Sequence, residues 1–169
     1  MNHADPDIFA NGIRTDRGLV LGALRVRLAQ TESDLTRVLD LRTRRFRTEC
    51  PDDDAFDDRF RHLMVEQVAT ERLVATARLH LIPQPAGSGA AHSYAAQFYD
   101  MRALLAHYGA ALEIGRLCLE PDSPPDTARA VLVGLTLHAQ AAGVQALLGC
   151  ASFAGADPAR HAASLGRLR

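Results

Sequence analysis

The segment LEIGRLCLEPD, residues 112–122, has the composition of a buried β-strand that ends at a proline. Glu113 and Arg116 nevertheless place both signs of charge inside it. A buried charge costs several kcal/mol unless it is paired or faces water. Residues three apart on a regular strand point to opposite faces. Either Gly115 allows a β-bulge that brings both side chains to one side, or one side chain faces a cleft and the other is held by a helix. We therefore favour a strand that borders a cleft over a structural ion pair in the core.

On either side of this segment, the spacing of apolar residues predicts further strands and helices. We expect strands at 24–29, 62–67, 72–83 and 146–153, and helices at 31–49, 101–108, 127–142 and from 157 onward. The strands at 62–67 and 72–83 form a hairpin, because only a short turn separates them. Residues 1–22 are polar and interrupted by glycines, so we expect a flexible N-terminal segment before one domain over residues 23–169. This order predicts a mixed α/β layer fold with helices on a partly antiparallel sheet.

The composition excludes several classes of function. The formal net charge is −1, which argues against a general nucleic-acid binder. All 19 basic residues are arginines, so Schiff-base chemistry and a lysine-dependent phosphate loop are excluded. Three widely spaced cysteines suit a reducing cytosol better than a disulfide framework. The first residues, MNHADPDIFANG, lack the apolar segment of a signal peptide, and no apolar run reaches the ~20 residues of a membrane span.

Two charged features leave both a structural and a functional interpretation open. Asp54 and Asp57 flank Phe56 in the segment DDDAFDD, which is either a solvated acidic loop or a site for a cation or an amine. Arg42 lies on the apolar stripe of the first predicted helix. It either extends its charge out of the core or reaches into a pocket to meet a carboxylate or phosphate. The other arginines of that helix form a basic face, which is either solvated or suited to an acidic partner.

Three further features of the sequence concern a cleft, a metal site and a phosphate-binding loop. Arg78 lies in the middle of the strand VATARLHLI and shares a face with His80, which suits the lining of a cleft. Neither CxxC nor HExxH spacing occurs, so the sequence predicts no metal site. The segment EPDSPPDTARA has no glycine, and its prolines lack N–H donors, so it does not encode a cradle for a phosphate.

Six segments occur together, in this order, in one known family: LRTRRF, DDDAFDDRFRHLMVE, VATARLHLIP, SYAAQFYDM, LEIGRLCLEPD and LLGCASFAGADP. The chain therefore resembles the ornithine–acyl carrier protein N-acyltransferases of ornithine-lipid synthesis, which are relatives of the acyl-homoserine lactone synthases within the GNAT superfamily. The resemblance covers roughly residues 24–168, and LEIGRLCLEPD and GCASFAGADP are its most specific parts. It implies a three-layer α/β, GNAT-like fold whose central, mostly antiparallel sheet is flanked by helices.

The resemblance also implies which residues bind the substrate. Arg42 and Phe46 match the helix pair that shapes the acceptor side of the site. Asp54 and Asp57 match the acidic loop that organises the substrate entrance.

The catalytic residues implied by the resemblance are Glu113, Arg116 and Arg78. Glu113 is the candidate for binding the amine and accepting its proton. Arg116 or Arg42 would hold the carboxylate of the amino acid, and backbone N–H groups around Arg78 would hold the oxyanion. The charges of the segment at 112–122 would then face substrate and water.

The implied reaction is aminolysis of a thioester. The acyl group would arrive on the phosphopantetheine of acyl carrier protein, and ornithine or a similar amino acid would accept it, without a separate cofactor, a metal or nucleic acid. The missing glycine-rich loop fits a carrier-protein donor better than acetyl-CoA. The protein would be cytoplasmic, with room for peripheral contact at the inner face of the membrane.

Two alternatives remain beside this reaction. One is an acyl-homoserine lactone synthase-like enzyme that uses S-adenosylmethionine, and the other is a non-catalytic relative that binds acyl carrier protein. Members of the family usually continue beyond the helix that follows GCASFAGADP, whereas this chain ends at Arg169. We therefore expect the domain to lack the C-terminal part usual in the family.

Overall fold

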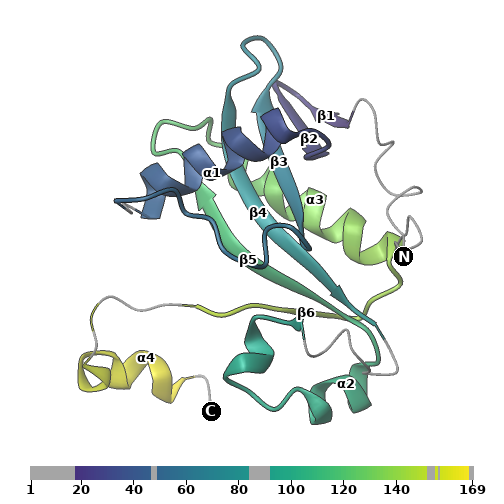
Figure 1. Ribbon diagram of the computed structural model, residues 1–169, viewed down its shortest axis with the longest axis vertical. Helices are drawn as coiled ribbons and strands as arrows, with labels where there is room; N and C mark the ends of the chain where they lie inside the picture. The colour runs from purple at the N-terminus through teal and green to yellow at the C-terminus, as the bar shows by residue number, and fades with distance from the viewer. Residues whose placement is uncertain (1–17, 47–48, 84–91, 152–154, 156, 168–169) are drawn as a thin grey trace.

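The computed structural model describes residues 18–46, 49–83, 92–151, 155 and 157–167, and its elements are labelled in Figure 1. In chain order they are β1 (Leu19–Leu21), β2 (Leu24–Leu28), α1 (Glu32–Phe46), β3 (Arg61–Gln67), β4 (Leu73–Ile82), the 3-10 helix η2 (Ala95–Gln97), α2 (Arg102–Tyr108), β5 (Ala111–Leu119), α3 (Thr127–Ala141), β6 (Ala146–Leu148), the 3-10 helix η3 (Pro158–His161) and α4 (Ala162–Gly166). The strands form one sheet in the order β1-β2-β3-β4-β5-β6. Neighbouring strands are antiparallel, except that β5 and β6 are parallel. The predicted mixed and mostly antiparallel sheet is therefore confirmed.

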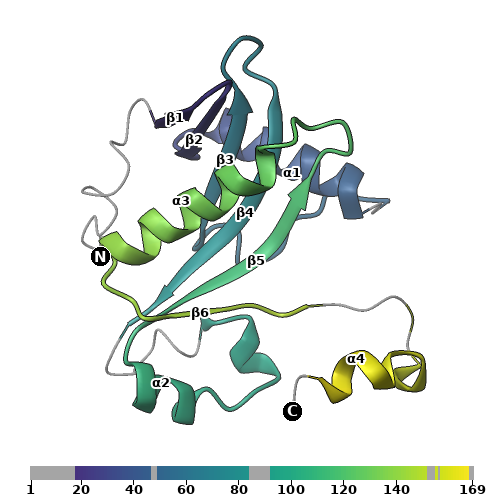
Figure 2. The ribbon, with the colours of Figure 1, turned by 180° about the vertical axis from the view of Figure 1, so that it is seen from behind.

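Two long helices cover the two faces of this sheet and give the three layers implied by the resemblance. α1 crosses one face in Figure 1, and α3 crosses the other, as the reverse view in Figure 2 shows. The larger apolar core lies between the sheet and α3. On the opposite face, Val38 and Leu41 of α1 pack with Met64 and Cys118. Because parallel strands need a long crossover connection, α3 also provides the link from β5 to β6.

Gly134 lets α3 approach the sheet closely. A Cβ atom at this position would lie 2.7 Å from a methyl carbon of Val26 and 3.1 Å from one of Leu63. A glycine inside a helix costs about 1 kcal/mol relative to alanine. The close contact with β2 and β3 explains why the helix contains glycine here.

Ion pairs around Arg27 tie the first turn of α1 to the sheet. The Arg27 guanidinium donates to both carboxylate oxygens of Asp34, at 2.8 and 2.6 Å, and to both of Glu66, at 2.7 and 3.0 Å. The hydrogen bonds from Arg27 are the main reason why the pKa of the Asp34 carboxyl falls well below its usual range. Since Asp34 belongs to α1 and Glu66 to β3, this pairing fixes the helix on its face of the sheet.

The structure differs from the sequence-based expectation at both ends of the sheet. Residues 19–21, which we expected within a flexible segment, form β1 and pair with β2, while residues 1–17 lie outside the described residues. The last strand, expected at 146–153, pairs with β5 only over Ala146–Leu148, and residues 152–154 lie outside the described part. None of the described helices is long and apolar enough to cross a membrane.

Candidate active site

The sheet opens between its last two strands, and a cavity lies at the opening. β6 stays beside β5 for three residue pairs, of which the last joins Leu148 to Glu113. The chain after β6 then diverges from β5, as both ribbon views show. The cavity there has a volume of about 600 Å³ and is lined by residues 113–117 and 147–151, together with Phe46, Phe60, Arg78 and Tyr94. This volume suits a small-molecule ligand, so the cavity is the candidate active site.

Gly149 marks the point where the two strands separate. A Cβ atom on Gly149 would lie 2.6 Å from the carbonyl oxygen of Ile114, closer than folded proteins tolerate. We expect Gly149→Ala to lower the free energy of unfolding by about 1–3 kcal/mol through overpacking, as measured by urea denaturation. Gly166→Ala is the control, because no atom lies within 4 Å of a Cβ there. Equal stability of Gly149→Ala and the wild type would contradict this close approach of the strands.

A bulge in β5 brings Glu113 and Arg116 to the same cavity. The register between β4 and β5 shifts between Thr76 and Arg78, and β5 contains one more residue than β4 in that interval. Arg116 has a φ of 49°, a left-handed conformation that is uncommon for a residue with a side chain. Of the two arrangements that the sequence left open, the structure has the bulge, and Arg116 rather than Gly115 takes the left-handed conformation. Both charged side chains line the cavity, which answers why this core strand carries them.

Glu113 is a buried carboxylate in the wall of the cavity, with 3% of its surface exposed. Its Oε2 accepts a hydrogen bond from the backbone N–H of Tyr94 at 3.0 Å, and its Oε1 accepts one from that of Ala95 at 2.7 Å. These bonds hold the start of η2 against β5. Each carboxylate oxygen can accept further hydrogen bonds, so Glu113 can still contact a ligand.

Three arginines and three aspartates beside the cavity form one ion cluster, of which Arg78 and Arg116 line the cavity. We call it the Arg–Asp cluster: Arg42, Arg78, Arg116, Asp52, Asp54 and Asp57. Arg42 donates to Asp52 at 2.7 Å and to both oxygens of Asp57 at 2.6 and 3.0 Å. Arg78 donates through Nη1 to Asp54 at 2.6 Å and to Asp57 at 3.0 Å. The cluster therefore joins α1 and β4 to the acidic loop before β3.

Arg116 is held more loosely than the other two arginines of the Arg–Asp cluster. Its Nε lies 3.4 Å from Asp52 and its Nη2 lies 3.5 Å from Asp54. Its side chain is partly exposed, and the guanidinium carbon lies 5.5 Å from the centre of the Phe46 ring, at the end of α1. Arg116 is therefore the arginine whose charge is most accessible from the cavity.

The Arg–Asp cluster corrects the interpretation of Arg42. Its side chain is 1% exposed, is enclosed by Asp52 and Asp57, and does not line the cavity. It is therefore not positioned to hold the carboxylate of a substrate, which we had considered from the sequence. Arg42 instead holds the acidic loop in place.

Asp54 and Asp57 pair with arginine side chains of the chain itself. The interpretation of this loop as a site for a bound cation or amine is therefore not supported. Burial alone would raise the pKa of the Asp57 carboxyl, but hydrogen bonds from Arg42 and Arg78 lower that pKa below its usual range. The two aspartates also accept hydrogen bonds from backbone N–H groups of their own loop, and neither lines the cavity.

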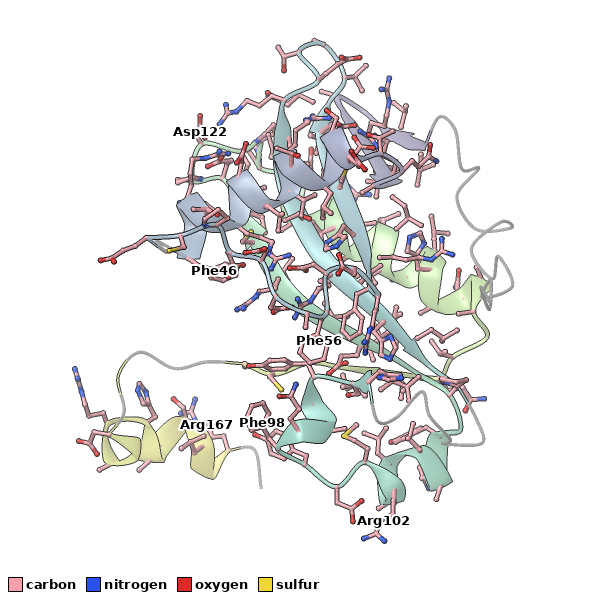
Figure 3. All side chains as sticks on the ribbon, in the orientation of Figure 1. Phe46, Phe56, Phe98, Arg102, Asp122 and Arg167 are labelled. Atoms are coloured by element: carbon pink, nitrogen blue, oxygen red, sulfur yellow. The ribbon has the colours of Figure 1, made fainter. Side chains whose placement is uncertain are left out.

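Aromatic side chains enclose Arg78 on the cavity side of the sheet. The rings of Phe56 and Phe60 each lie 5.3 Å from its guanidinium carbon, and Phe56 projects from the acidic loop in Figure 3. His80, which we expected to face a cleft, stacks on Phe60 with ring centres 4.2 Å apart. Because the Phe56 and Phe60 ring centres are only 5.2 Å apart, both rings cover the same side of the Arg78 guanidinium. The Arg78 backbone is paired with His62 of β3 and Gly115 of β5.

Of the seven site residues predicted from the sequence, four line the cavity: Phe46, Arg78, Glu113 and Arg116. Asp52 was not predicted as a site residue, although it belongs to the same acidic run as Asp54. Tyr94 was not predicted either, because its segment SYAAQFYDM contributed only to the family resemblance. Among the described residues, no group of His, Cys, Asp and Glu side chains could hold a metal ion.

Comparison with solved structures identifies the class of fold. A Trypanosoma brucei acetyltransferase matches with a TM-score of 0.52 and 18% identity, over 86% of this chain and 90% of that one. Glucosamine-6-phosphate N-acetyltransferase from Arabidopsis thaliana matches with a TM-score of 0.51 and 10% identity, over 85% of this chain and 88% of that one. Both share the fold of an acetyltransferase. Residues 36–133 match the acetyltransferase (GNAT) domain family, and the chain belongs to this family.

Comparison with characterised sequences confirms the more specific resemblance. L-ornithine N(alpha)-acyltransferase from Brucella abortus is 30% identical over an alignment of 168 positions that covers 88% of this chain. The protein of the same name from Agrobacterium fabrum is 29% identical, and its match also covers 88% of this chain. The chain spans 59% and 57% of the lengths of these two relatives.

Proposed function

We propose that this chain is an N-acyltransferase that moves a (3-hydroxy)acyl group from acyl carrier protein to the α-amine of ornithine, giving lyso-ornithine lipid. The observation that carries the proposal is the bulge in β5, which brings a buried carboxylate and an accessible guanidinium to one cavity at the opening of the sheet. The names of the two relatives support ornithine as the acceptor over S-adenosylmethionine.

The opening between β5 and β6 is suited to an extended thioester donor. Pairing between these strands ends at Glu113, so the side of β5 that faces away from β4 borders the cavity beyond this residue. An extended pantetheine arm can bind along such a strand edge through main-chain hydrogen bonds. A carrier-protein donor is favoured because the segment before α3, EPDSPPD, lacks the glycines of a phosphate-binding loop.

The same opening changes where we place the oxyanion. From the sequence we expected N–H groups around Arg78 to hold it, but β4 is paired with a strand on each side at that residue. N–H groups of β5 beyond Glu113 lie at the open side of the sheet instead. In a cavity with little water, such donors can stabilise the developing negative charge strongly.

Arg116 and Glu113 bind two different groups of the amino acid, the α-carboxylate and the α-ammonium group. The guanidinium of Arg116 is suited to the α-carboxylate of the acceptor, since arginine binds carboxylates through two parallel hydrogen bonds. Glu113 attracts the α-ammonium group and accepts its proton, directly or through a water molecule. The free amine then faces the thioester carbonyl.

The reaction needs no covalent intermediate with the enzyme. The amine nitrogen bonds to the thioester carbonyl carbon, the oxyanion collapses, and the C–S bond breaks to leave an amide and a thiol that takes up a proton. Cys150 lines the cavity, but burial and the nearby charge of Glu113 raise its thiol pKa, which disfavours the thiolate needed for nucleophilic attack. Positioning the two reactants accounts for up to ~7–11 kcal/mol of the barrier in reactions of this kind.

The proposal is tested by the release of free thiol from a 3-hydroxyacyl carrier protein, with and without ornithine, beside the matching acyl-CoA. We expect release that depends on ornithine and on the carrier protein, and none with S-adenosylmethionine in place of ornithine. Arg116→Gln should raise the KM for ornithine about 10–100-fold, because a hydrogen bond between charged groups contributes about 1.5–3 kcal/mol. Arg45→Gln is the matched control on α1, since Arg45 is exposed and does not line the cavity.

Each outcome has a distinct meaning. Binding of the carrier protein without any thiol release would identify a non-catalytic relative and contradict the proposed activity. Release with S-adenosylmethionine but not with ornithine would reassign the acceptor. Equal KM values for Arg116→Gln and Arg45→Gln would remove Arg116 from the binding of the carboxylate.

A further inference from the structure

Exposed apolar side chains gather at one end of the molecule, on η2–α2 and α4. Phe98 and Tyr99 are 64% and 65% exposed, and Tyr108 and Leu165 are also among the exposed large apolar residues. Figures 1 and 2 both place α2 and α4 at the lower end, beyond β6. Single exposed apolar residues are normal, but a group of them marks an interaction surface.

The inner side of this segment is already filled, so its aromatic residues are not part of the core. Ala95, Met101 and Leu105 are buried and pack with Ile82 and Ala111 of the sheet. Phe98 and Tyr99 lie on the chain between these buried residues yet remain outside. We call the exposed group, Phe98, Tyr99, Tyr108 and Leu165, the aromatic end.

Arginines surround the aromatic end. Arg102 is on α2, Arg160 on η3 and Arg167 follows α4, and all three are exposed. Figure 3 shows Phe98, Arg102 and Arg167 on this lower end of the molecule. Residues 95–108 and 157–167 carry these three arginines and two aspartates, Asp100 and Asp157, whereas the whole chain has a net charge of −1. Asp100 pairs with Arg102 at 2.6 Å, so the excess positive charge of this end comes from Arg160 and Arg167.

We propose that the aromatic end binds the surface of a membrane that contains anionic lipids. Tyrosine and other aromatic side chains favour the level of the lipid headgroups, where one part of the ring is apolar and another is hydrated. Arginines near a membrane surface are attracted to anionic headgroups, with about 1 kcal/mol for each residue. The same short segments present both kinds of side chain on the outside of the molecule.

The aromatic end lies beside the cavity, so its contact with a membrane would bring the cavity close to the lipid. Tyr94 lines the cavity, and its ring centre lies 5.4 Å from that of Phe98. A product with a long acyl chain, which this inference takes from the proposed function, would therefore leave the cavity next to the membrane. The contact is peripheral and inserts side chains only.

The test measures binding of the full chain to vesicles by co-sedimentation, without any substrate. Vesicles of phosphatidylcholine alone are compared with vesicles that also contain phosphatidylglycerol, and we expect tighter binding to the latter. The double variant Phe98→Ser, Tyr99→Ser should lower the partition coefficient by at least about tenfold. Leu132→Ser is the matched control, because Leu132 is 62% exposed but lies on α3.

A second variant tests the electrostatic part. Arg102→Gln with Arg167→Gln should weaken binding to the anionic vesicles and leave binding to phosphatidylcholine alone unchanged. Far-UV circular dichroism and thermal unfolding confirm that each variant is folded, since all the altered side chains are exposed.

Three results would overturn the inference. The first is that the wild type does not bind vesicles. The second is that Leu132→Ser loses as much binding as the double variant. The third is that the double variant loses self-association rather than vesicle binding, which would identify a contact between copies of the chain. Failure of the proposed function is separate from these, because thiol release is measured with soluble substrates. A chain that binds vesicles but releases no thiol would contradict only the proposed function.

Discussion

Replacing Arg42 by methionine will lower the free energy of unfolding by about 3–5 kcal/mol, the cost of removing one partner from a buried ion pair. Methionine keeps much of the volume but leaves Asp52 and Asp57 without their closest cation. Urea denaturation followed by circular dichroism measures the change. Arg45→Met is the control on the same turn of α1, where an exposed arginine should change stability by no more than about 0.5 kcal/mol.

The effect of Arg42→Met depends on pH in a defined direction. Burial works against ionised Asp57, but its arginine partners lower its folded pKa below the unfolded value of about 3.9. The paired carboxylate therefore stabilises the fold above that unfolded pKa, and this contribution is lost as the pH falls through the folded pKa. The difference in free energy of unfolding between the wild type and Arg42→Met should therefore become smaller in acid. A difference no larger than that for Arg45→Met at neutral pH would contradict a buried Arg–Asp cluster.

The bulge in β5 was predictable from the sequence because its cause is local. Glu113 and Arg116 conflict with a regular buried strand, and the glycine between them indicates how the chain resolves the conflict. The mixed sheet was similarly predictable, because it follows from the order of strands and helices, whereas the three layers were implied by the family resemblance.

The partners of the charged residues were not predictable, because they depend on contacts between distant parts of the chain. Arg116 and Asp54 are 62 positions apart, and the sequence gives each a charge but not a partner. The hydrogen bonds to Glu113 come from backbone N–H groups, which leave no pattern in the residue types. The opening of the sheet depends on the approach of Gly149 to Ile114, which becomes visible only when both strands are placed.

Replacing Glu113 by glutamine will lower kcat by about 10²–10⁴-fold, the usual contribution of a general base. Glutamine has nearly the same shape, but its amide nitrogen cannot accept a proton. The N–H groups of Tyr94 and Ala95 bond different oxygens of Glu113, and glutamine replaces one of these oxygens with an NH2 group, which cannot accept. The remaining N–H group then loses its acceptor, which should cost about 1–3 kcal/mol of stability.

Glu66→Gln separates the loss of catalysis from this loss of stability. Glu66 is also 3% exposed and accepts hydrogen bonds from Arg27, but it does not line the cavity. We expect both variants to be destabilised and only Glu113→Gln to lose most of its turnover at a temperature where both are folded. A similar loss of kcat in the two variants would indicate that Glu113 acts through stability alone.

The pH dependence of kcat distinguishes proton acceptance by Glu113 from its structural role in holding η2. If Glu113 takes the proton of the α-ammonium group, the rate of Glu113→Gln should recover as rising pH supplies the free amine from solution. If Glu113 only positions Tyr94 and Ala95, rising pH will not restore the rate, because the free amine cannot correct the position of this wall of the cavity. Stopped-flow or continuous thiol detection across the range in which the α-amine of ornithine ionises measures this difference. Recovery with pH would assign the proton transfer to Glu113, and a rate that stays low would leave Glu113 as the residue that shapes the cavity.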